Sequence, residues 1–151
     1  VMTEKVRYGL LSTAQIGLNA HYPASIESEI SEIVSVSSRS AKRAKEVANR
    51  NNIDRWYGSY EEQLADPDVD AIVNCLPNGM HCEWTIKAAE TGKHILCEKP
   101  LAISVEECVK MIDAAKANHV ILVEAFTHRW NSHLIKARRK VSERVIGKVQ
   151  T

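Results

Sequence analysis

Short apolar runs alternate with segments of helical periodicity along most of the chain. The runs predict strands over residues 6–11, 33–37, 71–75, 94–97 and 120–124, with a weaker strand over 55–57. Helical patterns between them predict helices over residues 40–51, 59–65, 80–91 and 104–118. Such alternation is typical of βαβ units, in which helices cover a parallel sheet. The fold class expected from the pattern is therefore α/β.

Serine and glycine residues mark the ends of the predicted helices. Ser40, Ser59 and Ser104 each precede a run of helix-forming residues, and Ser104 with Glu107 matches a capping box. Gly92 is placed to end the helix before the strand over 94–97. The apolar positions of these helices are assigned to the core with no chemical role: Val47, Leu64, Ile86, Ala89, Val109 and Ile112.

The composition indicates one globular domain. The 151 residues are 44% hydrophobic with a net charge of +1, which gives no reason to expect nucleic acid or an anionic membrane as a partner. No apolar stretch reaches the roughly 20 residues of a membrane span. The four cysteines are widely spaced without a CxxC pair, as expected of free thiols in a cytoplasmic protein. His81-Cys82-Glu83 lacks the downstream cysteine pair of zinc deaminases, so no metal site is expected.

The first strand leads into small residues where a dinucleotide-binding fold places its phosphate turn. Small residues there let the backbone approach a pyrophosphate, and the following helix offers free amides. The strict G-x-G-x-x-G pattern is absent, because Ser12 and Ala14 occupy glycine positions and only Gly17 closes it. An ordinary strand-to-helix turn therefore remains an alternative interpretation.

The end of the second strand favours NADP over NAD. Dinucleotide folds usually present an acid here to the ribose hydroxyls, and this chain has Ser38 and Arg39 instead, with Arg43 one turn into the next helix. A hydroxyl and guanidinium groups suit a 2'-phosphate, which an acid would repel. A basic helix start with capping serines is the alternative.

Glu98, Lys99 and Pro100 follow directly on the strand over 94–97. A buried parallel strand delivers its last residues to the carboxyl edge of the sheet, where open α/β folds bind ligands. The sequence therefore predicts that Lys99 points into a crevice. A solvated ion pair before a turn is the alternative.

Several motifs, taken in order, resemble one known family. They are the turn after the first strand, residues 76–81, residues 89–94, Glu98-Lys99-Pro100, and residues 124–126 followed by Arg129 and Trp130. The chain resembles the N-terminal domain of the Gfo/Idh/MocA oxidoreductases over essentially its whole length. The resemblance implies a Rossmann-type doubly wound parallel sheet over 1–130, and a connecting helix over 131–151 that begins a missing C-terminal substrate domain. Asn131 to Glu143 is otherwise a basic amphipathic segment, for which a solvated helix face is favoured over a membrane or partner surface.

The resemblance also implies roles for individual residues. The pyrophosphate would be lined by Ser12, Thr13, Ala14, Gln15 and Ile16, and the adenosine phosphate by Ser38, Arg39 and Arg43. Cys75, Leu76, Pro77, Asn78 and His81 would border the nicotinamide ribose, Glu98, Lys99 and Pro100 the reacting ring, and Arg129 also belongs to the cofactor set. Lys99 matches the family lysine that assists proton transfer at the substrate hydroxyl.

The function expected from these motifs is the NADP(H)-binding domain of an oxidoreductase acting on a sugar, polyol or dihydrodiol. Without a substrate domain the chain should bind the cofactor, turn over poorly and, through uncovered apolar surface, form homo-oligomers. One alternative is a non-catalytic dinucleotide sensor or interaction domain, against which Lys99 argues. A flavodoxin-like module is a third, weaker alternative, because its phosphate loop would be richer in Ser and Thr.

Overall fold

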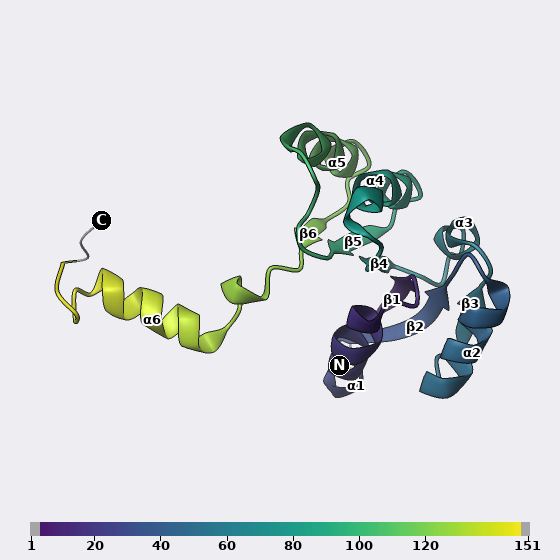
Figure 1. Cartoon of the computed structure of the whole chain (residues 1–151), viewed down its shortest axis with the longest axis horizontal. Helices are drawn as coiled ribbons and strands as arrows, with labels where there is room; N and C mark the ends of the chain where they lie inside the picture. The colour runs from purple at the N-terminus through teal and green to yellow at the C-terminus, as the bar shows by residue number, and fades with distance from the viewer. Residues whose placement is uncertain (1–3, 149–151) are drawn as a thin grey trace.

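A computed structural model describes residues 4–148 of the chain. Its six-stranded sheet has the order β3-β2-β1-β4-β5-β6 with parallel pairing throughout (Figure 1). The strands are β1 (Val6–Leu11), β2 (Ser31–Ser37), β3 (Arg55–Tyr57), β4 (Ala71–Asn74), β5 (His94–Cys97) and β6 (Leu122–Glu124). The predicted α/β class and doubly wound sheet are confirmed, and the predicted strand ends differ by two residues at most.

Helices cover both faces of the sheet, with α1 and α2 on one side and α4 and α5 on the other (Figure 1). The longer helices are α1 (Tyr22–Glu27), α2 (Ala41–Asn51), α3 (Tyr60–Leu64), α4 (His81–Glu90), α5 (Val105–Ala117) and α6 (Ser132–Ser142). Three short turns complete the list: the π-helical η1 (Gly17–His21) and the 3-10 turns η2 (Asn78–Met80) and η3 (Thr127–Arg129). Gly92 follows α4 with a φ of +76°, as the sequence predicts.

The predicted N-caps are confirmed. The side chains of Ser40, Ser59 and Ser104 each accept a hydrogen bond from the amide three residues later. The capping box is only half formed, because the carboxylate of Glu107 accepts from the amide of Ile103 at 3.1 Å rather than from Ser104. These caps fix where α2, α3 and α5 begin, and therefore the length of the loops at the edge of the sheet.

The core forms two layers because successive strand residues point to opposite faces. Leu11 and Ile72 pack in the cluster under α4 and α5, whereas Leu10 and Val73 pack in the cluster under α1 and α2. The assignment of Val109 and Ile112 to the core is wrong, since they are 51% and 41% exposed. The face of α5 that is buried carries Met111 and Ala115. At 100° per residue, position 109 lies about 160° around the helix from position 111, which places it on the outer face.

Ion pairs join β1 and β3 to the loop before β4 at the amino edge of the sheet, which is opposite the edge where the strands end. The guanidinium of Arg7 donates to both carboxylate oxygens of Asp70, at 3.0 and 2.8 Å. Arg55 similarly bridges Asp66 and Asp68 at 2.8 Å each. The hydrogen bonds from Arg7 hold the pKa of Asp70 below its ordinary value. This network holds the loop before β4 in place, and it lies far from the carboxyl edge of the sheet.

The chain leaves the sheet after β6, and α6 projects away from the helices and strands (Figure 1). Residues 126–148 are all exposed. The predicted connecting segment over 131–151 therefore contains a helix, while its last three residues lie outside the described part of the chain. Between residues 4 and 148, none of the helices combines the length and apolar character that crossing a membrane requires.

Candidate cofactor site

The order of the sheet reverses between β1 and β4, and the loops after β1, β2 and β4 meet at this point. Open α/β sheets bind ligands in the crevice at such a switch point. A cavity of about 440 Å³ lies there, lined by Ser12, Thr13, Ala14, Ser38, Arg39, Arg43, Tyr60, Cys75, Leu76, Pro77 and Met80. All of these except Tyr60 and Met80 are site residues predicted from the sequence, so the fold brings three separate motifs to one cavity.

The turn after β1 is held by the side chain of Ser12. Ser12 has a φ of 94°, in the left-handed region that favours glycine. Its hydroxyl donates to the Cys75 carbonyl at 3.1 Å and accepts from the Ala14 amide at 3.2 Å. Because these contacts offset the strain, the turn keeps its left-handed residue without a glycine and is joined to the loop after β4.

A helical segment over residues 15–27 follows this turn, and η1 forms its second turn. The sequence does not predict this helix, because Pro23 and a mixed polar pattern hide its periodicity. The first amides of a helix have no intrahelical partner and can bind an anion. A Cβ on Gly17 would lie 3.3 Å from the sulfur of Cys75, so glycine lets the helix approach the sheet closely. Gln15 and Ile16 are exposed at the start of this segment.

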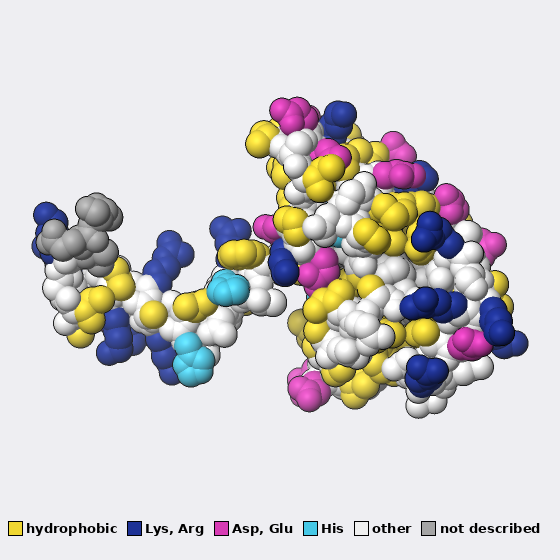
Figure 2. Space-filling model, in the orientation of Figure 1, with side chains coloured by type: hydrophobic (Ala, Val, Ile, Leu, Met, Phe, Trp, Pro, Cys, Tyr) yellow, Lys and Arg dark blue, Asp and Glu magenta, His cyan; other side chains and the backbone are white. Residues whose placement is uncertain are grey.

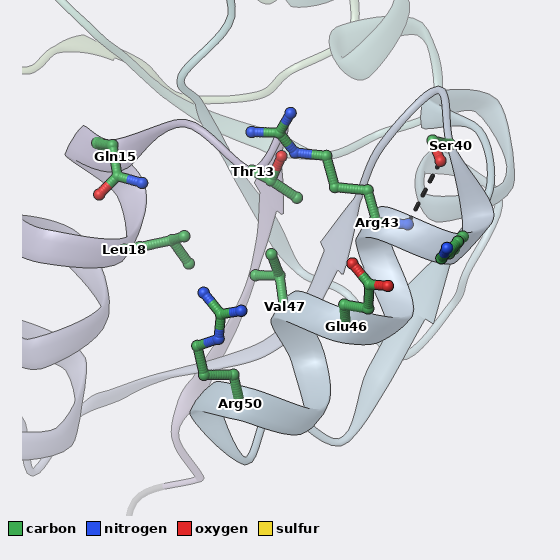
Figure 3. Close-up of a pocket in the computed structure, with 9 residues that line it drawn as sticks. Thr13, Gln15, Leu18, Ser40, Arg43, Glu46, Val47 and Arg50 are labelled. Atoms are coloured by element: carbon green, nitrogen blue, oxygen red, sulfur yellow. Dashed lines mark hydrogen bonds between the residues drawn. The ribbon is translucent and has the colours of Figure 1, made fainter.

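A second cavity of about 350 Å³ continues from Thr13 along α2 (Figure 3). Arg43 extends beside Thr13, whereas Arg50 extends toward Leu18, with Glu46 between the two arginines on α2 (Figure 3). The other lining residues are Gln15, Ser40, Lys42 and Val47. Arg50 was not predicted, although its spacing of seven from Arg43 places both on one helix face.

Cations dominate this end of the site. Arg39, Lys42, Arg43 and Arg50 are all exposed. Arg39 lines the first cavity, whereas Lys42, Arg43 and Arg50 line the second together with the acid Glu46. Dark blue side chains are accordingly prominent over and around α2 (Figure 2). An excess of guanidinium groups around a cavity is suited to binding phosphate.

The loop after β5 carries the predicted catalytic residue. One oxygen of the Glu98 carboxylate lies 2.7 Å from Nε2 of His21, and the other accepts the Lys99 amide at 3.2 Å. Both partners of the first contact are largely buried, with 19% of the His21 and 13% of the Glu98 side chain exposed. The Lys99 side chain is exposed beside this pair. His21 was missed because nothing in the local sequence links a π-helical turn to a residue 77 positions away.

His81 lies beneath the site and has no exposed surface. Its Nδ1 is 2.9 Å from the Pro100 carbonyl and its Nε2 is 2.8 Å from the Leu76 carbonyl. The bond between Lys99 and Pro100 is cis. His81 therefore contacts the two loops that were predicted to border the nicotinamide, while neither of the two cavities includes it.

The buried cysteines at this edge are unreactive thiols. Burial raises the pKa of both Cys75 and Cys97 to about 12, with the nearby charge of Glu98 adding to the shift. Both therefore stay protonated at neutral pH and neither is a nucleophile. Asn78 and Arg129 are exposed in η2 and η3, outside the two cavities. Their assignment to the cofactor stays a prediction.

Residues 6–126 match the GFO_IDH_MocA family, described as an oxidoreductase family with an NAD-binding Rossmann fold. The chain belongs to this family. Its relatives include the D-xylose 1-dehydrogenase (NADP(+)) 2 of Haloferax volcanii, 41% identical over 82% of this chain and 38% of that protein. The trans-1,2-dihydrobenzene-1,2-diol dehydrogenase of Xenopus tropicalis is 35% identical over 79% of this chain and 36% of that protein.

Solved structures agree with the fold. The 3-ketoreductase KijD10 of Actinomadura kijaniata, in complex with TDP-benzene and NADP in an open conformation, superposes with a TM-score of 0.89. It is 28% identical, and the match covers 96% of this chain and 46% of the KijD10 chain. The chain thus spans less than half the length of these relatives, and its family assignment concerns the Rossmann domain.

Proposed function

We propose that this chain is the NADP(H)-binding domain of an oxidoreductase that transfers hydride between the nicotinamide and a sugar, polyol or dihydrodiol. The observation that carries the proposal is the cavity at the switch point, where Ser12, Ser38, Arg39 and Leu76 meet. It has the position of a dinucleotide site and lacks an acid at the end of β2.

The residues present fit NADP(H). The turn at Ser12 lines the cavity, and the helical segment that follows it approaches the sheet closely at Gly17, so its first amides would be available to a pyrophosphate there. Ser38, Arg39 and Arg43 would hold the 2'-phosphate, with hydrogen bonds that are charge-assisted in the case of the arginines. Leu76, in the loop after β4, would border the nicotinamide ribose.

The chemistry of the domain centres on Lys99. When bound, NADP(H) supplies or accepts the hydride at its nicotinamide ring. The exposed ammonium of Lys99 can give a proton to a carbonyl oxygen as it becomes a hydroxyl, and can take one back in the reverse direction. The Glu98 carboxylate accepts a hydrogen bond from the backbone amide of Lys99 and so holds the backbone from which the lysine side chain extends.

The names of the relatives support the substrate class. Two of them are named as dehydrogenases of D-xylose and of a dihydrodiol. The third is named as a 3-ketoreductase, and its structure contains TDP-benzene and NADP. A hydroxyl or ketone on a ring or polyol carbon is common to the reactions of such enzymes. A carbonyl or carbinol group next to Lys99 is therefore the expected reactive centre.

Calorimetry on the chain itself tests the cofactor assignment. NADPH should bind about tenfold to a hundredfold more tightly than NADH at one fixed salt concentration, as expected of one or two charge-assisted phosphate contacts. Equal affinities would contradict the choice of NADP. Absence of binding by either nucleotide would overturn the proposed function.

A further inference from the structure

His81 connects two loops that are far apart in the sequence. The ring lies within hydrogen-bond distance of the Leu76 carbonyl, in the loop after β4, and of the Pro100 carbonyl, which follows Lys99. The side chain has no exposed surface, so water does not replace either partner. The Asn74 side chain donates to the His81 carbonyl at 3.3 Å and to the Thr85 hydroxyl at 3.2 Å, which holds the start of α4 in place.

The chemistry of these contacts fixes the number of protons on the ring. A carbonyl oxygen only accepts hydrogen bonds, and a neutral imidazole has one N–H and one lone pair. A neutral ring would donate to one of the two carbonyl oxygens and direct its lone pair at the other, which would leave that one buried acceptor at a repulsive contact. Donation to Leu76 and Pro100 together requires an N–H on each nitrogen of His81.

We propose that His81 is a positioning residue that donates from both ring nitrogens, as the imidazolium, and fastens the loop after β4 to Glu98–Pro100. The inference rests on the proposed function in one respect: these are the loops assigned to the nicotinamide end of NADP(H). His81 itself touches neither substrate nor cofactor. It acts through the backbone that places Leu76 and Lys99.

The charges around the ring are compatible with a cation. The titratable groups on the segments packed around His81 are Cys75, Cys82, Cys97, Glu98, Lys99 and Glu124, and within residues 4–148 none of them has a hydrogen bond to the ring. The carboxylate of Glu124 accepts the Leu101 amide at 2.9 Å, directly after Pro100. Glu98 and Glu124 thus place two carboxylates beside the segment that the ring holds, and Lys99 places an ammonium on the same segment.

Nuclear magnetic resonance measures the ring protons directly. The 15N-labelled chain is examined by long-range 1H–15N correlations of its histidine rings at pH 7, with exposed His133 as the internal reference. Both nitrogens of His81 should show the shift of a protonated nitrogen. A single unprotonated nitrogen on His81 at pH 7 would overturn the proposal.

Variants then test whether the two donations position the cofactor loops. His81→Gln keeps one donor and His81→Phe keeps none, whereas His133→Gln changes an exposed histidine on α6. NADPH affinity should fall about tenfold for Gln and further for Phe, with no change for the control, because a buried carbonyl loses its partner. If His81→Phe does not fold, the Gln variant and the ring-proton measurement still decide the question.

The pH profile separates positioning from a merely structural role. For the unmodified chain, NADPH affinity should decline by about tenfold as rising pH removes one ring proton, and His81→Gln should lack this decline. An identical profile in the two proteins would overturn the proposal. A chain whose His81 carries both protons but which binds no NADPH would support the loop attachment and overturn the proposed function, so the two failures are distinguishable.

Discussion

The two ends of the candidate site are built in opposite ways. At the adenosine end, Arg39, Arg43 and Arg50 are exposed side chains on and before α2. At the nicotinamide end, a buried or half-buried network holds the backbone, with His21 against Glu98 and His81 against Pro100. Under the proposed function, cofactor choice at the first end would depend on side chains that can change without disturbing the core. Geometry at the second end depends on contacts that cannot be replaced singly, because each leaves a buried group without a partner.

The largest effect is expected at Lys99, the exposed side chain on the buried network. In an active protein that contains this domain, Lys99→Met should lower kcat by about a hundredfold or more, since general acid–base catalysis contributes at least that much. NADPH affinity should change little, which steady-state kinetics and calorimetry measure together. Lys110→Met, an exposed lysine on α5, is the control. Turnover within a few fold of the unmodified protein would remove Lys99 from the proton-transfer role.

Arg39 should control the choice of cofactor. Arg39→Ala should erase most of the preference for NADPH over NADH, a loss of about tenfold to a hundredfold, while the affinity for NADH stays nearly constant. Lys45→Ala, an exposed lysine of α2 outside both cavities, provides the matched control. Calorimetry at two salt concentrations should show the preference decreasing with salt, because the arginine is exposed. A preference that survives the substitution would assign the phosphate to Arg43 or Arg50.

Lys99 and Arg39 could both be identified from the sequence, because the features that locate them are local. Strand ends, serine caps and the Glu98-Lys99-Pro100 motif are encoded in a few adjacent residues, so a pattern of apolar runs locates them. The pairing of His21 with Glu98 depends on a π-helical turn meeting a loop 77 residues away, and no local pattern encodes it. The exposure of Val109 has a similar cause, since periodicity shows that a helix has an apolar face but not how much of it the fold covers.

A smaller effect is expected from His21. His21→Gln should weaken NADPH binding by about threefold to tenfold, because the Glu98 carboxylate loses a short contact that orients it, worth roughly 1 kcal/mol. Cofactor choice should not change, since the adenosine end is untouched. Parallel titrations with NADPH and NADH test both statements, with His133→Gln as the control. A shift in the ratio of the two affinities would show that the two ends are coupled, contrary to the comparison.

The smallest effect on the site is expected from the amino edge of the sheet. Arg7 lowers the pKa of Asp70 from its ordinary 3.8, so the pair stabilises the fold above that pH, and this stabilisation is lost as acid protonates Asp70 through its lowered pKa. Asp70→Asn should therefore reduce the free energy of unfolding at pH 7 by about 0.5 to 1 kcal/mol, the range for partly exposed pairs. The difference from the unmodified chain should vanish below the lowered pKa. Urea unfolding at a series of pH values measures this, and calorimetry should find NADPH affinity unchanged. A variant that lost affinity as well as stability would show that the amino edge, and not the buried network alone, sets the geometry of the nicotinamide end.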